Sequence, residues 1–282
     1  MTLQPIFILI ALWSIVVAVT LFLFVYPRYR RRKLDTTPFP PAWLTILRRN
    51  LSVYKSMWPD QQEQLRKLIV RFLRGKDFVG CAGQEINDEI RVTIAAQACL
   101  LLLNRPSHEY QDLRTILVYP SGFMVNRDHH DEFGLVTEQK RFLSGESWSN
   151  GKVILAWDSV ERGIRNFRDG ENVVLHEFAH QLDHESGITN GAPLLYSKGS
   201  YSKWARIFSE EFSALQKASD EERATLIDQY GATDPAEFFA VVTETFYERP
   251  HEMAHEHAEL FEELKAYYRV DPREWQHKPP LS

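Results

Sequence analysis

Residues 172–183 read NVVLHEFAHQLD and contain His176 and His180 in the frame His-Glu-x-x-His. Residues four apart lie on one face of a helix, so the two imidazoles can hold one zinc ion while Glu177 approaches its water. Apolar residues flank the frame and also fill its two variable positions. We therefore expect a buried helix whose polar stripe faces a cleft, where a dry environment makes a metal ion a stronger Lewis acid.

The same frame occurs a second time, as HEMAH at residues 251–255. Pro250 precedes this copy and is suited to the first turn of a helix, where its missing N–H costs nothing. The acidic sequence EHAE follows at residues 256–259. These surroundings predict a solvated helix start, so we expect the metal at His176 and His180 and not at His251 and His255.

Two histidines leave a catalytic zinc ion short of one protein ligand. One known arrangement places a glycine and then a third ligand shortly after the second histidine, but Asp183 and Ser186 occupy these two positions. His184 lies one turn beyond His180, and on a continuous helix it would be about 12 Å from His176. That distance is too long for both imidazoles to bind one ion at roughly 2 Å. We therefore expect His184 at the surface.

A carboxylate from a later helix is the remaining source of a third ligand. Residues 234–244 read DPAEFFAVVTE, with Asp234 placed to cap a helix that begins at Pro235. Glu237 and Glu244 then share one face of an otherwise apolar helix. Buried acidic side chains need partners, and a divalent cation supplies one. Pairing of the two glutamates with Arg or Lys is the alternative.

The rest of the domain predicts an α+β fold that is mostly helical and has a small sheet. The strand at 152–157 is expected either to pair with an extended peptide as an edge strand or to be buried in the core. Cys81 and Cys99 have no metal or redox spacing, so they are expected to be buried thiols. The predicted helices cover residues 58–74, 86–103, 202–218, 221–229, 235–247 and 251–268, and the predicted strands cover 115–119, 134–136 and 152–157.

The N-terminal segment predicts a membrane anchor. Residues 6–26 are apolar and uncharged, and as one helix they would extend about 31 Å, the thickness of a bilayer core. Basic residues follow the segment (Arg28, Arg30, Arg31, Arg32 and Lys33) and none precedes it, which disfavours a cleaved signal peptide and predicts a cytoplasmic domain at the inner membrane. The predicted organisation is an anchor at 6–26, a basic and Pro-rich linker at 27–55 and a catalytic domain at 56–282. With a net charge of −5 and no large basic patch outside residues 28–55, direct nucleic-acid binding is not expected.

The sequence resembles the Mlc titration factor A family of zinc peptidases. The resemblance rests on NVVLHEFAHQLD at 172–183, Tyr230, and DPAEFFAV at 234–241, with further likeness in GESW at 145–148 and LAWD at 155–158. It implies a zincin-like metallopeptidase fold in which His176, His180 and Glu237 bind Zn²⁺ and Glu177 is the catalytic base. It also implies a tyrosine near the metal at Tyr230.

These observations predict hydrolysis of peptide or protein substrates by a zinc-activated water. Asp183 and Glu244 are candidates to orient the histidine ligands through the other ring nitrogen. Two other classes stay open. The resemblance includes capture of a transcriptional regulator, so the chain could be a binding protein with little proteolysis. A structural zinc domain is disfavoured, because such sites usually have four protein ligands.

Overall fold

The computed structural model describes residues 4–26, 29, 36–105, 110–130, 136–143, 145–148, 151–195 and 199–276. The chain divides into two compact units, Met1–Phe39 and Pro40–Ser282. The basic residues at 28 and 30–33 lie outside the described residues, as do Gly134 and Leu135 of one predicted strand.

The first unit contains helix α1, Gln4–Thr20, followed by the π-helical turn η1, Leu21–Val25. None of the helices in the described ranges is both long and apolar enough to cross a membrane. The transmembrane helix predicted over residues 6–26 is therefore not found. The α-helical part of this segment, α1, has 17 residues and is followed directly by the five residues of η1.

The second unit is built on a small sheet with the strand order β1-β2-β6-β5. Strands β1 (Asp77–Gly80), β2 (Thr115–Tyr119) and β6 (Lys152–Ala156) are parallel, whereas β5 (Gly145–Trp148) runs antiparallel to β6. A separate antiparallel pair consists of β3 (Phe123–His130) and β4 (Val136–Leu143). The strand predicted at 152–157 thus lies inside the sheet, as its continuous apolar run suits, and β5 forms the edge.

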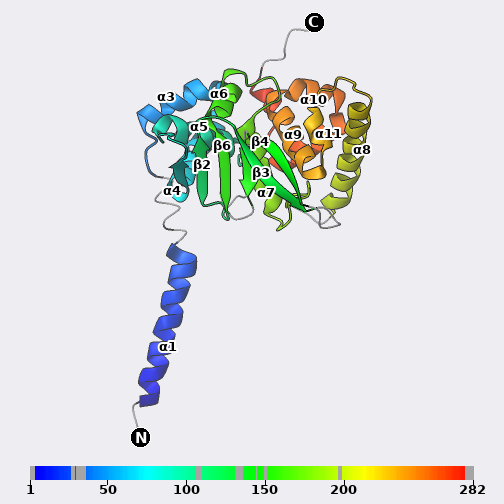
Figure 1. Ribbon diagram of the computed structural model, residues 1–282. Coiled ribbons are helices and arrows are strands. Elements are labelled where there is room, and N and C mark those ends of the chain that lie inside the picture. Colours follow the sequence, from blue (N-terminus) through cyan, green and yellow to red (C-terminus); the bar gives the residue numbers. More distant parts are fainter. Residues whose placement is uncertain are drawn as a thin grey trace. The chain divides into compact units, whose positions relative to one another are not determined.

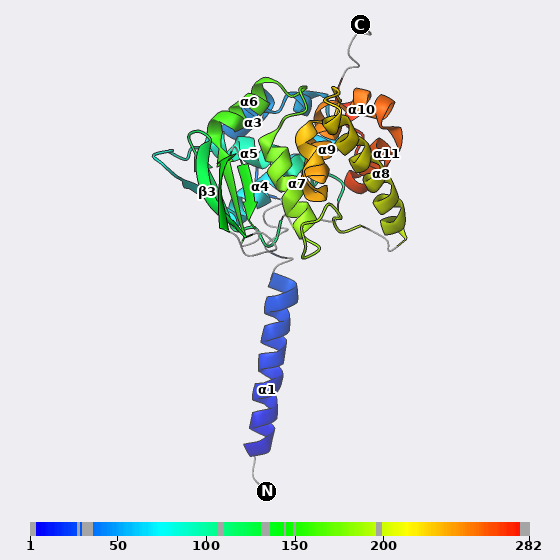
Figure 2. The same ribbon diagram turned by 45° about the vertical axis from the view of Figure 1, so that its right-hand side comes forward.

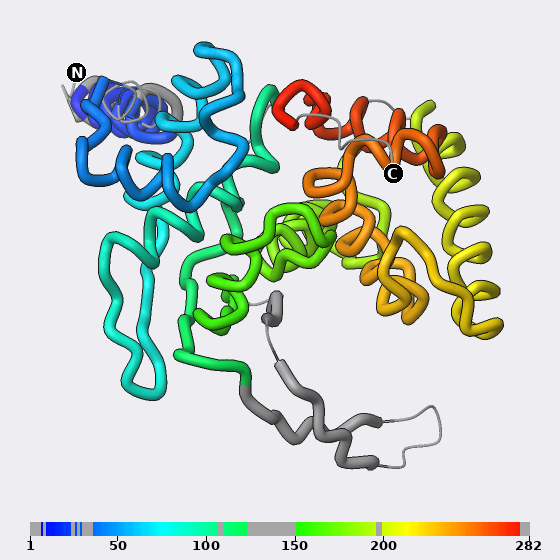
Figure 3. Tube along the Cα trace, turned by 90° about the horizontal axis from the view of Figure 1, so that it is seen from above, coloured from blue at the N-terminus to red at the C-terminus, as the bar shows by residue number. Residues whose placement is uncertain are grey.

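Helices make up most of the second unit, which confirms the α+β prediction. Helix α7 (Val173–His184) packs against β5 and β6, against α5 and against α9. Figures 1 and 2 show the sheet on one side of α7 and the C-terminal helices on the other, and Figure 3 shows the same division from above. The remaining helices are α3 (Pro41–Asn50), η2 (Ser52–Ser56), α4 (Pro59–Gly75), α5 (Asp88–Leu100), α6 (Trp157–Arg165), α8 (Ser200–Asp220), η3 (Gln229–Ala232), α9 (Pro235–Glu248), α10 (Pro250–Glu256), α11 (Ala258–Tyr268) and η4 (Pro272–Glu274).

Two helix predictions are wrong. No α-helix occupies residues 221–229, because α8 ends at Asp220 and Glu222 takes a left-handed backbone conformation with φ of 51°. The helix predicted over 251–268 is split into α10 and α11 at His257, where the backbone leaves the helical region (φ −128°, ψ 54°). The His257 side chain pairs with Glu211 of α8 at 2.8 Å, a contact between distant segments that local periodicity does not reveal.

Candidate metal centre

Helix α7 presents His176 and His180 at the centre of the domain. Its N-cap is Asn172, whose side-chain oxygen accepts hydrogen bonds from the backbone N–H groups of Val174 and Leu175, both at 3.1 Å. The opposite face of the helix is fully buried in the core. The side chain of His176 is 13% exposed and that of His180 is 11% exposed. Both imidazoles are therefore largely buried but still in contact with solvent.

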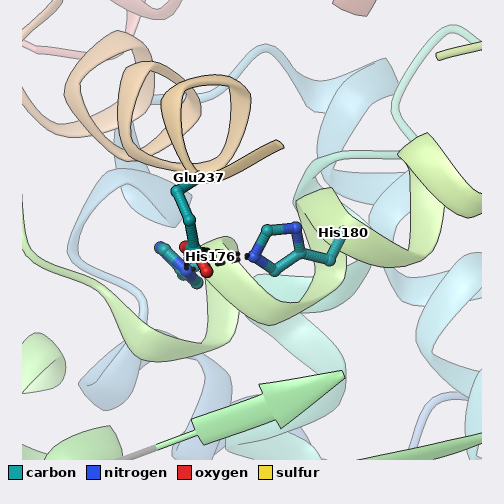
Figure 4. A group of neighbouring side chains, drawn as sticks. All are labelled: His176, His180 and Glu237. Carbon is teal, nitrogen blue, oxygen red and sulfur yellow. Dashed lines mark hydrogen bonds and ion pairs between the residues drawn. The ribbon is translucent and has the colours of Figure 1, made fainter. Parts of the chain in front are cut away.

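Helix α9 supplies the third donor. Asp234 caps this helix by accepting from the N–H groups of Ala236 and Glu237, and Pro235 occupies its first position. Glu237 therefore projects from the first turn, and Figure 4 shows its carboxylate reaching the two histidines from α9. Its side chain is 15% exposed.

The three donor atoms are spaced as ligands of one ion. Nε2 of His176 lies 3.0 Å from Oε2 of Glu237 and 3.2 Å from Nε2 of His180, and the third separation, His180 to Glu237, is 3.4 Å. Ligands about 2.0–2.1 Å from a tetrahedral metal ion are roughly 3.3 Å apart. His176, His180 and Glu237 are thus placed to bind a metal ion, and three protein donors leave one position of a tetrahedron open.

The electrostatics of the site favour a positive charge among these groups. Burial lowers the pKa of His176, but Glu244 and Glu237 outweigh that effect and raise it well above its usual value. Burial raises the pKa of Glu237, yet the hydrogen bonds from His176 and His180 bring it far below its usual value. The two shifts are complementary: the carboxylates favour a positive charge on His176, and the histidines favour the negative charge of Glu237. A metal ion bound among these groups would supply the positive charge.

Glu244 contacts the ring nitrogen of His176 that faces away from the metal position. Its Oε1 lies 2.8 Å from Nδ1 of His176, and its Oε2 accepts a hydrogen bond from the backbone N–H of Asn172. A carboxylate in this place keeps the proton on Nδ1 and leaves Nε2 available as a donor. Glu237 thus lies at the metal position, as the family resemblance implies, and Glu244 lies where it can orient a histidine.

Two further residues of this arrangement were not predicted from the sequence. Asn172 caps α7 and also donates through Nδ2 to Glu248, at 2.9 Å. The other oxygen of Glu248 accepts from the backbone N–H of Gly170 at 3.1 Å. Burial raises the pKa of Glu248 to about 9. The sequence does contain one indication of the role of Glu248. Glu248 lies one helical turn after Glu244, on the face of α9 that carries the acidic residues.

The predicted catalytic residues lie beside the donors. Glu177 is 5% exposed and follows His176 directly on α7. The ring of Tyr230 lies 6.0 Å from the His176 ring, centre to centre, and is 42% exposed. Tyr230 belongs to η3, whose start is fixed by a hydrogen bond from its own N–H to Asp228.

The other sequence candidates lie apart from this group. His184 contacts Thr189, and His251 contacts the backbone oxygen of Gln276. Within the described ranges, the second frame at 251–255 forms no group with metal-binding geometry. Cys99 is a buried thiol as predicted, whereas Cys81 is only half-buried.

A helix that carries two histidines four residues apart, completed by a glutamate from a later helix, defines a metallopeptidase-type centre. Comparison with known proteins agrees: residues 26–269 match the family described as glucose-regulated metallo-peptidase M90. The chain belongs to this family. Membership makes it a metallopeptidase by class and implies a metal ion, for which His176, His180 and Glu237 form the site.

Individual relatives extend the match over most of the chain. A protein of Synechocystis sp. named slr2042 is 40% identical over 263 residues, which cover 92% of this chain and 96% of that protein. Mlc titration factor A of Escherichia fergusonii is 33% identical over 225 residues, covering 79% of this chain and 84% of the relative. Mlc titration factor A of Klebsiella pneumoniae is 32% identical, with the same coverage. The predicted family resemblance is thereby confirmed.

Proposed function

We propose that the protein is a zinc-dependent peptidase that hydrolyses peptide bonds at the centre formed by α7 and α9. The observation that carries this proposal is the spacing of 3.0, 3.2 and 3.4 Å among the three donor atoms. Two imidazoles and one carboxylate are the donor set of many catalytic zinc sites. When bound, zinc would lower the pKa of a water molecule and polarise the carbonyl of the scissile bond.

Glu177 is the proposed general base. It is buried beside His176, where a carboxylate can take a proton from the attacking water and later deliver it to the leaving amine. Tyr230 has an exposed ring next to His176, and its hydroxyl is proposed to donate a hydrogen bond to the oxyanion that develops on the carbonyl. Glu244 keeps His176 in the required tautomer.

The edge strand β5 offers a binding position for an extended substrate. Among the strands of the described residues, β5 pairs only with β6, so its other edge is a position at which the backbone of an extended peptide can pair. Helix α7, with the metal donors, packs against β5. A peptide added to this edge would run alongside the helix that carries the catalytic residues.

The test compares the wild-type protein with Glu177→Gln. We expect the variant to bind one zinc ion with unchanged affinity and to lose peptide hydrolysis, because the amide cannot accept the proton of water. Zinc content by elemental analysis and cleavage of a peptide library by mass spectrometry measure the two properties. Wild-type activity in Glu177→Gln would refute the role of general base, and a wild-type protein without stoichiometric zinc would refute the proposal itself.

A second proposed function is binding of a transcriptional regulator with little proteolysis. It is favoured by the similarity to relatives whose name, Mlc titration factor A, denotes the titration of Mlc. This function needs no general base, so a regulator that wild type and Glu177→Gln bind equally well, and that wild type leaves uncleaved, would support it. Cleavage of the bound regulator by wild type but not by Glu177→Gln would identify it as a substrate instead.

The cytoplasmic placement of the domain stays a prediction from the sequence, in which the basic residues Arg28, Arg30, Arg31, Arg32 and Lys33 follow the apolar segment 6–26. Cell fractionation with a tagged full-length chain tests it, and protection of the domain from protease added outside the inner membrane is the expected result.

A further inference from the structure

Gly191 lies between the two helices that carry the metal donors, and two hydrogen bonds and a close approach to α9 fix its position. Its backbone N–H donates to Oδ2 of Asp183 at 2.6 Å. Its carbonyl oxygen accepts from the indole Nε1 of Trp204 at 3.0 Å. On its third side, a Cβ atom at position 191 would lie 2.3 Å from the carbonyl oxygen of Pro235. The backbone of the loop therefore touches the first residue of α9 directly.

Only glycine suits this position. The φ of Gly191 is +77°, in the region that side chains disfavour, and any Cβ would overlap with the Pro235 carbonyl. The two groups that hydrogen-bond to Gly191 are also buried: Asp183 is fully buried and Trp204 is 3% exposed. We call Asp183, Gly191 and Trp204 the interhelix clamp.

The interhelix clamp links α7 to α9 without using the side chains of the metal donors. Asp183 lies on α7 almost one turn after His180, and Pro235 lies on α9 two residues before Glu237. The path from His180 through Asp183 and Gly191 to Pro235 thus ends in the turn of α9 from which Glu237 projects.

Trp204 adds a second attachment to α9. Its ring stacks on Phe208 of α8 at 3.9 Å between ring centres and lies 5.9 Å from Phe239 of α9. The indole N–H is thereby held in place to bind the Gly191 carbonyl. The later part of α9 is tied to α7 separately, through Glu244 and Glu248 at Asn172. Helix α9 is thus attached to α7 at both of its ends, with the metal position between them.

We propose that Asp183, Gly191 and Trp204 are positioning residues that hold the first turn of α9 at the distance from α7 at which Glu237 completes the metal site. A metal site tolerates only small displacements of its ligands, because metal–ligand distances vary by about 0.2 Å in functional sites. Glu237 lies in a terminal turn, and helix ends fray unless other groups hold them. The inference rests on the metal site of the proposed function.

The test measures zinc affinity, which depends on donor placement and needs no substrate. Asp183→Ala removes the acceptor of the Gly191 N–H and should weaken zinc binding by about 10- to 100-fold, as losses outside the ligand set do. Asp183→Asn keeps an acceptor oxygen and should restore most of the affinity. Trp204→Phe keeps the aromatic stack but loses the indole donor, and it should weaken binding by about 2- to 10-fold, the value of one neutral hydrogen bond.

Competition with a chromophoric chelator gives the affinities, and the absorption spectrum of the Co²⁺-loaded protein reports a change in ligand geometry. Asp271→Ala is the matched control, because Asp271 also accepts a backbone N–H, that of Arg273, at 3.2 Å and belongs to a cluster outside the metal group. It should lower thermal stability and leave zinc affinity unchanged.

Wild-type zinc affinity and an unchanged Co²⁺ spectrum in folded Asp183→Ala would overturn the clamp and leave the proposed function intact. If Asp183→Ala does not fold, Trp204→Phe decides by the same criterion. Absence of zinc binding in the wild-type protein would overturn the proposed function and the clamp together.

Discussion

Replacing Glu244 with glutamine tests how much the metal site depends on support behind its ligands. Glu244 uses both oxygens: one lies 2.8 Å from Nδ1 of His176, and the other accepts the backbone N–H of Asn172. A glutamine has one acceptor oxygen for these two donors, so its NH₂ group must face one of them. Either His176 loses its partner, or the backbone N–H of Asn172 remains buried without an acceptor.

The expected loss follows from these contacts. Removing an outer partner of a histidine ligand typically lowers metal affinity by about 10- to 100-fold, which equals about 1.4–2.7 kcal/mol. Glu244→Gln should therefore raise the dissociation constant for zinc by this factor, and part of the effect comes from the lost negative charge. Isothermal titration or chelator competition at fixed pH measures it.

Glu248→Gln is the matched control. Glu248 is also a buried glutamate of α9 and also binds Asn172, but none of its hydrogen bonds in the described residues goes to a histidine. Glu248→Gln should lower zinc affinity by much less than Glu244→Gln does, because Glu244 still orients His176 and still binds Asn172. Equal affinities for wild type, Glu244→Gln and Glu248→Gln would refute the reasoning, because they would mean that His176 needs no orienting carboxylate.

Three further predictions concern individual residues. Glu237→Ala should reduce zinc affinity by more than Glu244→Gln does, since it removes a ligand. His255→Ala should leave the zinc content, measured by elemental analysis, unchanged. Loss of metal in His255→Ala would mean that the second frame holds the ion. Tyr230→Phe should lower kcat by about 10²- to 10³-fold with little change in KM if the hydroxyl acts only on the oxyanion, and an unchanged kcat would exclude that role. Burial raises the pKa of Glu248 to about 9 from 4.5, so between these values the folded state keeps a proton that the unfolded chain has lost. The free energy of unfolding should therefore fall by up to about 1.4 kcal/mol per pH unit as pH rises from 5 to 9, and urea unfolding of Glu248→Gln should show a flatter dependence.

Local rules were enough to identify most of the site. The frame at His176 and His180 follows from helical periodicity, and the Asp234–Pro235 pair marks the start of α9 through capping and the fixed φ of proline. The surroundings also separate the two copies of the frame, since apolar neighbours predict a buried helix and acidic neighbours a solvated one. These signals act over a few residues, so they can be read from the sequence.

Other features depend on contacts between segments far apart in the chain. Strand order is one: nothing local reveals that β5 covers the edge of β6. The break at His257 is another, because its partner Glu211 lies on α8. Gly191 is a third, since its need for glycine comes from the carbonyl of Pro235 and not from its own neighbours in the sequence.

The sequence by itself determined that a helix with two histidines and a helix with two glutamates would exist, because periodicity and caps are local. Periodicity did not determine which glutamate faces the metal, since Glu237 and Glu244 share one face of α9, and it was the family resemblance that assigned Glu237 to the metal. The physical reason for that assignment lies in the packing of α9 on α7. It brings Glu237 to Nε2 of His176, where a metal binds, and Glu244 to Nδ1, where a carboxylate orients the ring.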